Sequence, residues 1–233
     1  MPGGKNGRKN GTYHWYEIQD NVAYWQEFQK PKIIYPDIAI KCEFAFDNNS
    51  YFPDCTLFLI PSESKFLLAF LNSGVVQFFI NQICPAIRGD FRRFKSIYVS
   101  QIPIPATTEP ARKAIEILVA YVLHLTIALK DIPSYGENLM VVADDKLMLS
   151  YFEQIIDAVV MELYLPNELH AHDKYFMRHL LQENLPSLDE IKGEKMQALR
   201  QIFLRLFEKN HPIRVGIFFL DSVPVVRTIR GIT

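Results

Sequence analysis

The sequence predicts an α+β protein, with a mixed α/β first part up to Pro105 and a mainly helical part after it. Short apolar runs punctuated by proline, which are typical of strands, gather in the first part. Apolar residues at helical spacing dominate the second part. The composition also changes between the two parts. Residues 1–105 contain 19 of the 30 aromatic residues and carry a net charge of +2, whereas residues 106–233 carry a net charge of −3.

The bulk composition narrows the class of protein. The chain has 233 residues, of which 49% are hydrophobic and 22% charged, a balance that indicates a folded chain with a substantial core. A net charge of −1 gives no global field for nucleic acid or an anionic membrane. The three cysteines lack metal-ligand spacing and predict reduced thiols, so we expect a cytoplasmic protein. We find neither a secretory signal nor an apolar run of membrane-spanning length, and we expect no membrane partner.

The first part alternates between strand and helix signals. Residues 30–40, "KPKIIYPDIAI", and residues 56–61, "TLFLIP", predict strands. Residues 64–83 have apolar residues at helical spacing, opened by a Ser62 or Ser64 cap and broken at an Asn-Ser-Gly tripeptide.

The second part predicts helices and ends in a stretch that looks extended. Four helices are expected, over residues 111–130, 144–165, 172–184 and 187–210. Asp144 and Asp145 fit a cap, and Ser187 with Glu190 fits a capping box. The final residues, 211–233, read as extended chain.

A basic cluster precedes the boundary between the two parts. Four cations fall within eight residues and are interleaved with Phe91 and Phe94; they are Arg88, Arg92, Arg93 and Lys95. Such a loop suits a phosphate backbone, because cations displace condensed counterions and guanidinium groups read guanine edges. The alternative is a solvated loop whose phenylalanines pack inward. We expect Phe91, Phe94 and Tyr98 to be anchors that hold the loop down, since duplex DNA offers few free base faces for stacking. Arg88-Gly89-Asp90 is too short a motif to indicate cell adhesion.

No catalytic constellation accompanies this cluster. A Gly-rich phosphate loop, a nucleophile elbow and a zinc-protease motif are all absent. Asp157 and Glu162 lie five residues apart, so they point in different directions and make a poor acid–base pair, and we expect Asp157 to be a structural carboxylate. The spacing of the remaining polar cluster favours a helix start over a metal site; it comprises His170, His172, Asp173 and His179. We therefore expect that this chain is not an enzyme and holds no metal.

Several segments together resemble a known family. "KPKIIYPDIA", "YFPDCTLFLIP", "FLLAFLNSGVVQFFI" and "IRGDFRRFKSIYVSQIPIP" are similar, in order and spacing, to the TaqI-like C-terminal specificity domain of type II (type IIG) restriction-modification enzymes and related phage-defence DNA methyltransferases. "IDAVVMELYLP" and "HPIRVGIFFLDSVPVVRTIRG" resemble the helical tails of such enzymes. The resemblance implies a target-recognition lobe over residues 12–105 and a helical C-terminal lobe over 106–233.

The resemblance also implies a function, which is sequence-specific recognition of double-stranded DNA for an attached catalytic domain. The methyltransferase or endonuclease domain would lie in the same parent polypeptide, which we expect to be an adenine-specific methyltransferase, a type II restriction endonuclease or both. We expect no cofactor in this chain, and S-adenosylmethionine and magnesium only in that catalytic part. The family often has a second glycine where Asp90 stands, so Arg88 ranks behind the other cations of the cluster.

The expected DNA contacts extend beyond the basic cluster. Backbone anchors and adenine-reading amides complete the set, which comprises Arg92, Arg93, Lys95, Arg88, Lys30, Lys32, Lys41, Asn48 and Asn49. The alternative is a protein-interaction or structural module that docks against a methyltransferase core or a partner subunit. A continuous basic face on the first lobe would favour DNA, whereas a large exposed apolar patch on the helices would favour docking.

Overall fold

The structure is a computed structural model that describes residues 11–14, 16–17, 24–130 and 139–232. In the first part of this described chain, a short 3-10 helix, η1 (Trp25–Gln29), precedes two small antiparallel sheets. One sheet has the order β3-β1-β4, built from Ala45–Asp47, Lys32–Pro36 and Leu57–Ile60. The other has the order β2-β6-β5, built from Ile38–Ala39, Phe91–Arg93 and Ala86–Arg88. The expected strands in residues 30–40 and 56–61 are confirmed.

The residues after β4 form a broken helix, as the sequence predicts. Helix α1 (Lys65–Leu71) starts at Ser64, whose side chain accepts the Leu67 N–H. The next serine, Ser73, caps α2 (Gly74–Ile83) in the same way, so the break is a pair of adjoining helix ends. No single helix of the described residues has the length and apolar character to span a membrane, although α1 and α2 meet that test together as a pair bent by 60°.

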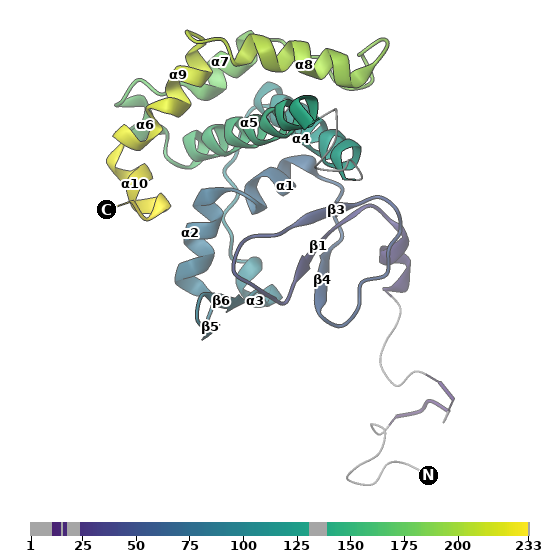
Figure 1. Cartoon of the computed structure of the whole chain (residues 1–233). Helices are drawn as coiled ribbons and strands as arrows, with labels where there is room; N and C mark the ends of the chain where they lie inside the picture. Colours follow the sequence, from purple (N-terminus) through teal and green to yellow (C-terminus); the bar gives the residue numbers. More distant parts are fainter. Residues whose placement is uncertain (1–10, 15, 18–23, 131–138, 233) are drawn as a thin grey trace.

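The remaining elements are helical. A short α3 (Ser96–Val99) follows β6, and the "IPIP" segment then leads into the second part. Its helices are α4 (Glu109–Leu129), α5 (Leu139–Tyr164), α6 (Pro166–His170), α7 (Phe176–Gln182), α8 (Lys195–Leu206), α9 (Pro212–Phe218) and α10 (Pro224–Arg230), with a 3-10 turn, η2 (Leu220–Ser222), before the last. Helices α4 and α5 lie between the sheets with α1 and α2 on one side and α7 and α8 on the other (Figure 1). The α+β class is therefore confirmed.

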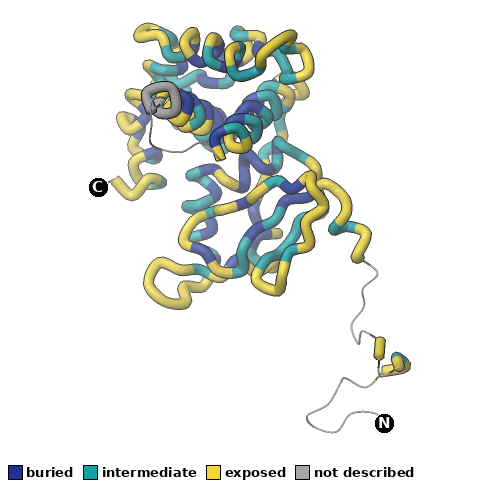
Figure 2. Tube along the Cα trace, turned by 45° about the vertical axis from the view of Figure 1, so that its right-hand side comes forward, coloured by how far each residue is buried: buried dark blue, intermediate teal, exposed yellow. Residues whose placement is uncertain are grey.

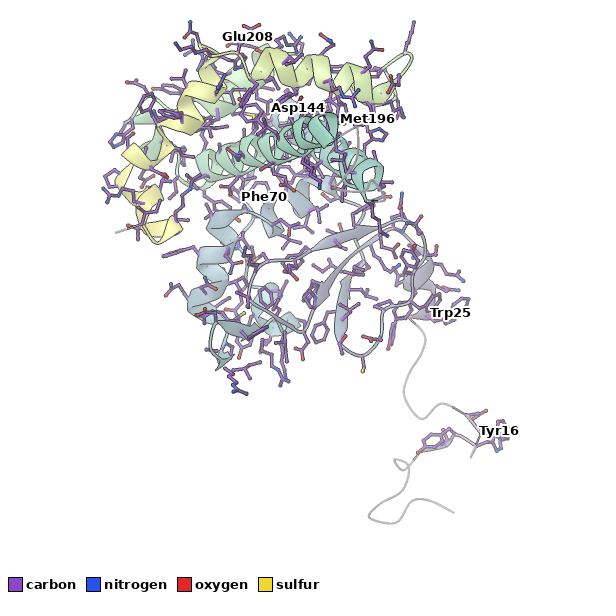
Figure 3. All side chains as sticks on the ribbon, in the orientation of Figure 1. Tyr16, Trp25, Phe70, Asp144, Met196 and Glu208 are labelled. Carbon is purple, nitrogen blue, oxygen red and sulfur yellow. The ribbon has the colours of Figure 1, made fainter. Side chains whose placement is uncertain are left out.

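One buried cluster runs through both parts of the chain. It extends from Ile33 in β1 through α1 and α4 to Val226 in α10 (Figure 2). Phe70 of α1 is fully buried at the junction and contacts Tyr164, at the end of α5, with ring centroids 5.5 Å apart (Figure 3). The division of the chain at residue 105 stays a prediction, and the two parts share an apolar contact surface through α1, α4 and α5.

Three local expectations are wrong. The final stretch is not extended, because Pro212 and Pro224 each occupy a first helical position and start α9 and α10. The Asp144-Asp145 pair does not cap a helix but lies inside α5, where buried Asp145 accepts two 2.8 Å hydrogen bonds from Arg200 of α8. Ser187 and Glu190 do form their hydrogen bonds, but these close a turn well before α8 begins.

The last helix is tied back to the first part through Asp157 of α5. Asp157 Oδ1 accepts the backbone N–H of Gly74 at 2.7 Å, and its Oδ2 lies 3.8 Å from Arg230 of α10. A side chain at position 74 would approach this carboxylate, since a Cβ there would lie 3.3 Å from Asp157 Oδ1. Asp157 thus joins α2, α5 and α10, which agrees with the structural role expected for it.

We expect Asp157→Ala to lower the free energy of unfolding by about 1–3 kcal/mol, because the Gly74 N–H loses its acceptor. Urea denaturation followed by circular dichroism measures this loss. Asp221→Ala is the matched control, since it removes an exposed 2.7 Å contact to the same Arg230 and should change stability by less than about 1 kcal/mol. Equal losses in the two variants would contradict a role for the Gly74 contact.

Candidate nucleic-acid interface

Three of the four cations of the basic cluster lie in the second sheet. Strands β5 and β6 are a hairpin in which Arg88 lies opposite Phe91, and β2 extends it by placing Ile38 opposite Arg93. Residues opposite one another share a face of the sheet, and neighbours along a strand point to opposite faces. The pairing therefore assigns Arg88, Phe91, Arg93 and Ile38 to one face and Arg92 to the other.

The inner face attaches this sheet to the core. The Arg92 guanidinium donates a 3.0 Å hydrogen bond to the carbonyl oxygen of Cys84, at the end of α2. Phe94, on the same side, is buried and packs edge-on against Phe44. Arg92 is thus engaged by the protein itself, and Phe94 is the anchor expected from the sequence.

The outer face, which we define as Arg88, Phe91, Arg93 and Ile38, is open to solvent. Phe91 is 46% exposed and Ile38 44% exposed, and the two arginines flank Phe91 along the hairpin. Phe91 therefore does not pack inward as the sequence suggested. Lys95 is also exposed, at the residue that precedes α3. The hairpin projects from the lower end of the first part (Figure 1). Cations and apolar side chains thus share one uncovered surface.

The hairpin turn explains the Arg-Gly-Asp tripeptide. Gly89 has φ +56°, a conformation that glycine adopts without steric cost, and nothing lies within 4 Å of where a Cβ would stand. Asp90 beside it is exposed at the tip. Arg88 therefore ends β5, and Gly89 and Asp90 form the turn into β6.

The other expected contacts lie away from this sheet. Asn48 and Asn49 are exposed after β3, and Ser50 joins their turn to η1 by donating to the Gln29 carbonyl at 2.9 Å. Lys30 follows η1 and pairs with Glu27 at 2.7 Å. This group lies on the opposite side of the first part from the hairpin (Figure 1). Exposed Lys41 lines, with the two asparagines, a cavity of about 860 Å³ against α4 and α5.

Lys32 differs from every other expected contact, because it is fully buried. Its ammonium bonds to the Asp47 carboxylate and to the Phe28 carbonyl oxygen at 2.7 Å. A side chain enclosed in this way has no route to a phosphate in this structure. We therefore leave Lys32 out of the interface.

Glu162 and His170, from the acidic pair and the histidine cluster, are engaged in structural contacts. Buried Glu162 accepts the Met177 N–H at 2.7 Å and contacts His170 Nε2 at 2.8 Å. His170 also stacks on Tyr175. Among the residues that the structure describes, no three histidine, cysteine or acidic side chains are arranged to hold a metal ion.

Two residues of this surface were not expected from the sequence, namely Ile38 and Asp37 beside it. Asp37 Oδ2 lies 3.6 Å from Arg93 Nε, so an acid borders the outer face. The order Phe91, Arg92, Arg93 was the one sequence signal for this arrangement. If the segment is a strand, its two arginines point to opposite faces of the sheet. That signal depends on assigning a strand to a segment that the sequence presents as a loop.

The second sheet lies within the part of the chain that matches a known protein family. Residues 4–104 match the model of the TaqI-like C-terminal specificity domain. The chain is 28% identical to the type II methyltransferase M.PaeR7I of Pseudomonas aeruginosa over 116 residues, which cover 47% of the chain and 20% of that protein. It is 26% identical to M.XhoI of Xanthomonas vasicola over 113 residues, covering 46% and 20%.

A third relative agrees with these two. M.BstVI of Geobacillus stearothermophilus, also a type II methyltransferase, is 28% identical over 104 residues, which cover 43% of this chain and 18% of that protein. The chain therefore spans about a fifth of the length of the curated relatives it matches. No solved structure matches it.

Proposed function

Residues 4–104 carry a TaqI-like C-terminal specificity domain, and from this premise we propose that the chain recognises double-stranded DNA for a restriction-modification methyltransferase. The observation that carries the proposal is the outer face together with Lys95. Two exposed arginines share a sheet face with an exposed phenylalanine, and a third exposed cation, Lys95, follows two residues after Arg93 inside the matched segment.

The chemistry of this surface suits duplex DNA. Arg88, Arg93 and Lys95 neutralise phosphates and release counterions, and an arginine is also able to bind guanine O6 and N7. Phe91 and Ile38 supply apolar contacts of the kind made with a thymine methyl group. Phosphate contacts then position the sheet, and contacts to base edges select the sequence.

The remaining expected contacts form a second, separate group. Lys30, Lys41, Asn48 and Asn49 are exposed, and we retain them as contacts that a bound duplex reaches only if it extends past the hairpin. The boundary at residue 105 also remains a proposal, with α4 setting the first lobe relative to the rest of the parent enzyme.

Catalysis belongs to another part of the parent polypeptide in this proposal. The relatives carry the name of type II methyltransferases, and the matched part of this chain is the specificity domain. S-adenosylmethionine and magnesium would bind that other part, whose contribution is the chemistry on the DNA. The residues described above would bind and orient the duplex.

A salt titration tests the proposal. We expect the 233-residue chain to bind a fluorescent 30-base-pair duplex of mixed sequence, with an affinity that falls as salt rises from 50 to 200 mM. Each neutralised phosphate contributes a slope of about −0.9 in log K against log salt, so three cations predict about −2.7. Absence of binding at the lowest salt, or binding that salt does not weaken, would overturn the proposal.

Two neighbouring arginines provide a matched pair of variants. We expect Arg93→Gln to weaken duplex binding about threefold to tenfold and to reduce the salt slope by up to about 0.9, because its guanidinium lies on the outer face. Arg92→Gln should leave the slope unchanged, since Arg92 is bonded to Cys84 on the inner face. The same anisotropy titration measures both, and equal effects would contradict the assignment of faces.

A docking module remains the second candidate, because exposed aromatic side chains gather beside η1. Phe28 stacks on Phe52 with centroids 5.1 Å apart, and the exposed neighbours are Tyr24, Trp25, Tyr51 and Phe52 (Figure 3 labels Trp25). Such a patch suits a protein partner. If Trp25→Ala abolished association with a methyltransferase core while duplex binding stayed absent in all variants, docking would replace DNA recognition.

A further inference from the structure

Asp37 occupies a fixed position at the corner between β1 and β2. Its backbone N–H donates to the Thr56 carbonyl oxygen at 2.8 Å, and its own carbonyl oxygen accepts the Phe94 N–H at 2.7 Å. Thr56 is itself held by Asp54, which accepts both its N–H and its hydroxyl. The Asp37 main chain is therefore clamped between both sheets, which keeps the carboxylate close to β6.

The contacts of the Asp37 carboxylate are poor for an acid in this position. Its Oδ1 is buried and finds no hydrogen-bond partner among the residues that the structure describes. Its Oδ2 lies 3.6 Å from Arg93 Nε, which exceeds the usual N–H···O distance of about 2.7–3.2 Å. A buried carboxylate oxygen without a hydrogen-bond partner destabilises the fold. Stability therefore does not explain the presence of an acid at this corner.

The neighbouring arginine supplies that explanation. Arg93 is 44% exposed and belongs to the outer face, where the proposed function puts phosphates and base edges. An exposed ion pair of this length is weak, so Arg93 is able to leave Asp37 for a stronger anion. Every phosphate that takes Arg93 must nevertheless approach a fixed negative charge.

We propose that Asp37 is a positioning residue that restrains Arg93 from indiscriminate phosphate contact and so sharpens discrimination between DNA sequences. The inference rests on the proposed function of the outer face. When Arg93 contacts only a phosphate, the negative charge of Asp37 opposes the contact. When a DNA sequence also offers Arg93 a well-placed base edge, the added hydrogen bonds outweigh that opposition. Specificity then arises from a repulsive element beside an attractive one.

The test measures the coupling between positions 37 and 93 with a mixed-sequence 30-base-pair duplex at 50 to 200 mM salt. We expect Asp37→Asn to tighten binding about threefold to tenfold and to steepen the salt slope by a fraction of the roughly 0.9 that one fully neutralised phosphate contributes, because Asp37 holds Arg93 back from full phosphate contact in the wild type. In an Arg93→Gln background the same substitution should change affinity by less than about 1.5-fold, because the guanidinium that Asp37 restrains is no longer present.

Asp90→Asn is the matched control, because Asp90 is an exposed acid in the turn between β5 and β6 and has no described contact to Arg93. Its effect should be equal in the presence and absence of Arg93. Asp37→Asn should melt near the wild-type temperature, whereas a merely structural ion pair would lower melting and leave the salt slope unchanged.

The outcomes separate the two proposals. If the chain binds duplex but Asp37→Asn has no effect, or has the same effect with and without Arg93, the role of Asp37 is overturned and the proposed function stands. If neither the chain nor any of these variants binds duplex, the proposed function fails and this inference fails with it.

Discussion

Asp47→Ala is expected to lower the free energy of unfolding by about 3–5 kcal/mol, a loss typical of breaking a buried ion pair. Lys32 is 0% exposed and Asp47 2% exposed, so the variant leaves an ammonium group in the core without its counter-charge. Asp47 also accepts the N–H groups of Asn49 and Tyr51 at 2.8 and 3.0 Å. Urea denaturation followed by circular dichroism at pH 7 gives the size of the loss.

An exposed ion pair provides the control for this prediction. Glu27→Ala breaks the pair with Lys30, whose side chain is 61% exposed, and should cost less than about 1 kcal/mol. The double variant Lys32→Met with Asp47→Leu should recover part of the stability, because apolar side chains remove the buried charges. A loss in Asp47→Ala no larger than that in Glu27→Ala would show that the pair is not closed to solvent.

The same pair makes stability depend on pH in a defined direction. Burial raises the pKa of Asp47, but the hydrogen bonds from Lys32, Asn49 and Tyr51 outweigh it and hold the pKa below the ordinary value of 3.8. An acid whose pKa is lowered by folding stabilises the fold above its unfolded pKa and loses that contribution as pH falls. The difference between wild type and Asp47→Asn should therefore be largest at neutral pH and shrink below about pH 4.

Reversing the charge of all three cations around the outer face is expected to weaken duplex binding about 100-fold or more at 50 mM salt. In Arg88→Glu, Arg93→Glu and Lys95→Glu combined, each position loses a phosphate contact and gains a repulsion. The substitutions lie on exposed sites, so melting should stay near wild type. Fluorescence anisotropy with the 30-base-pair duplex measures the affinity and its salt dependence.

A second triple variant distinguishes a local interface from overall charge. It reverses three exposed cations of the helical lobe, namely Arg178, Lys192 and Lys209. Net charge changes equally in both variants, but this control should weaken binding by less than about threefold, since the altered charges are screened beyond about 10 Å. Comparable losses in the two variants would refute the assignment of DNA contacts to the outer face.

Much of the fold follows from local sequence signals. Ser64 and Ser73 start α1 and α2 through side-chain caps, and the apolar spacing of residues 111–130 corresponds to α4. These predictions succeed because a cap or a helical stripe involves only neighbouring residues. Residues 211–233 resemble extended chain because their aromatic and β-branched residues are typical of strands. Their prolines instead stand at the first positions of α9 and α10.

The candidate site was less accessible to sequence reasoning, because its arrangement depends on distant partners. The cluster of cations was visible, but the pairing of β6 with β2 separates Arg93 from Arg92, and β2 lies more than fifty residues earlier in the chain. In the sequence Lys32 cannot be distinguished from the other lysines. Only the pairing of β1 with β3, which places Asp47 opposite Lys32, shows that Lys32 is a core residue.

The sequence by itself determined the α+β class, the broken helix of residues 64–83, the long helix of residues 111–130, and the concentration of positive charge before residue 105. The tertiary structure alone decided which of those charges face solvent, that Phe91 is exposed beside them, and that Asp37 lies against Arg93. The physical reason is that composition and local propensity act along the chain. Burial, strand pairing and the field at a side chain are set by residues that folding brings together.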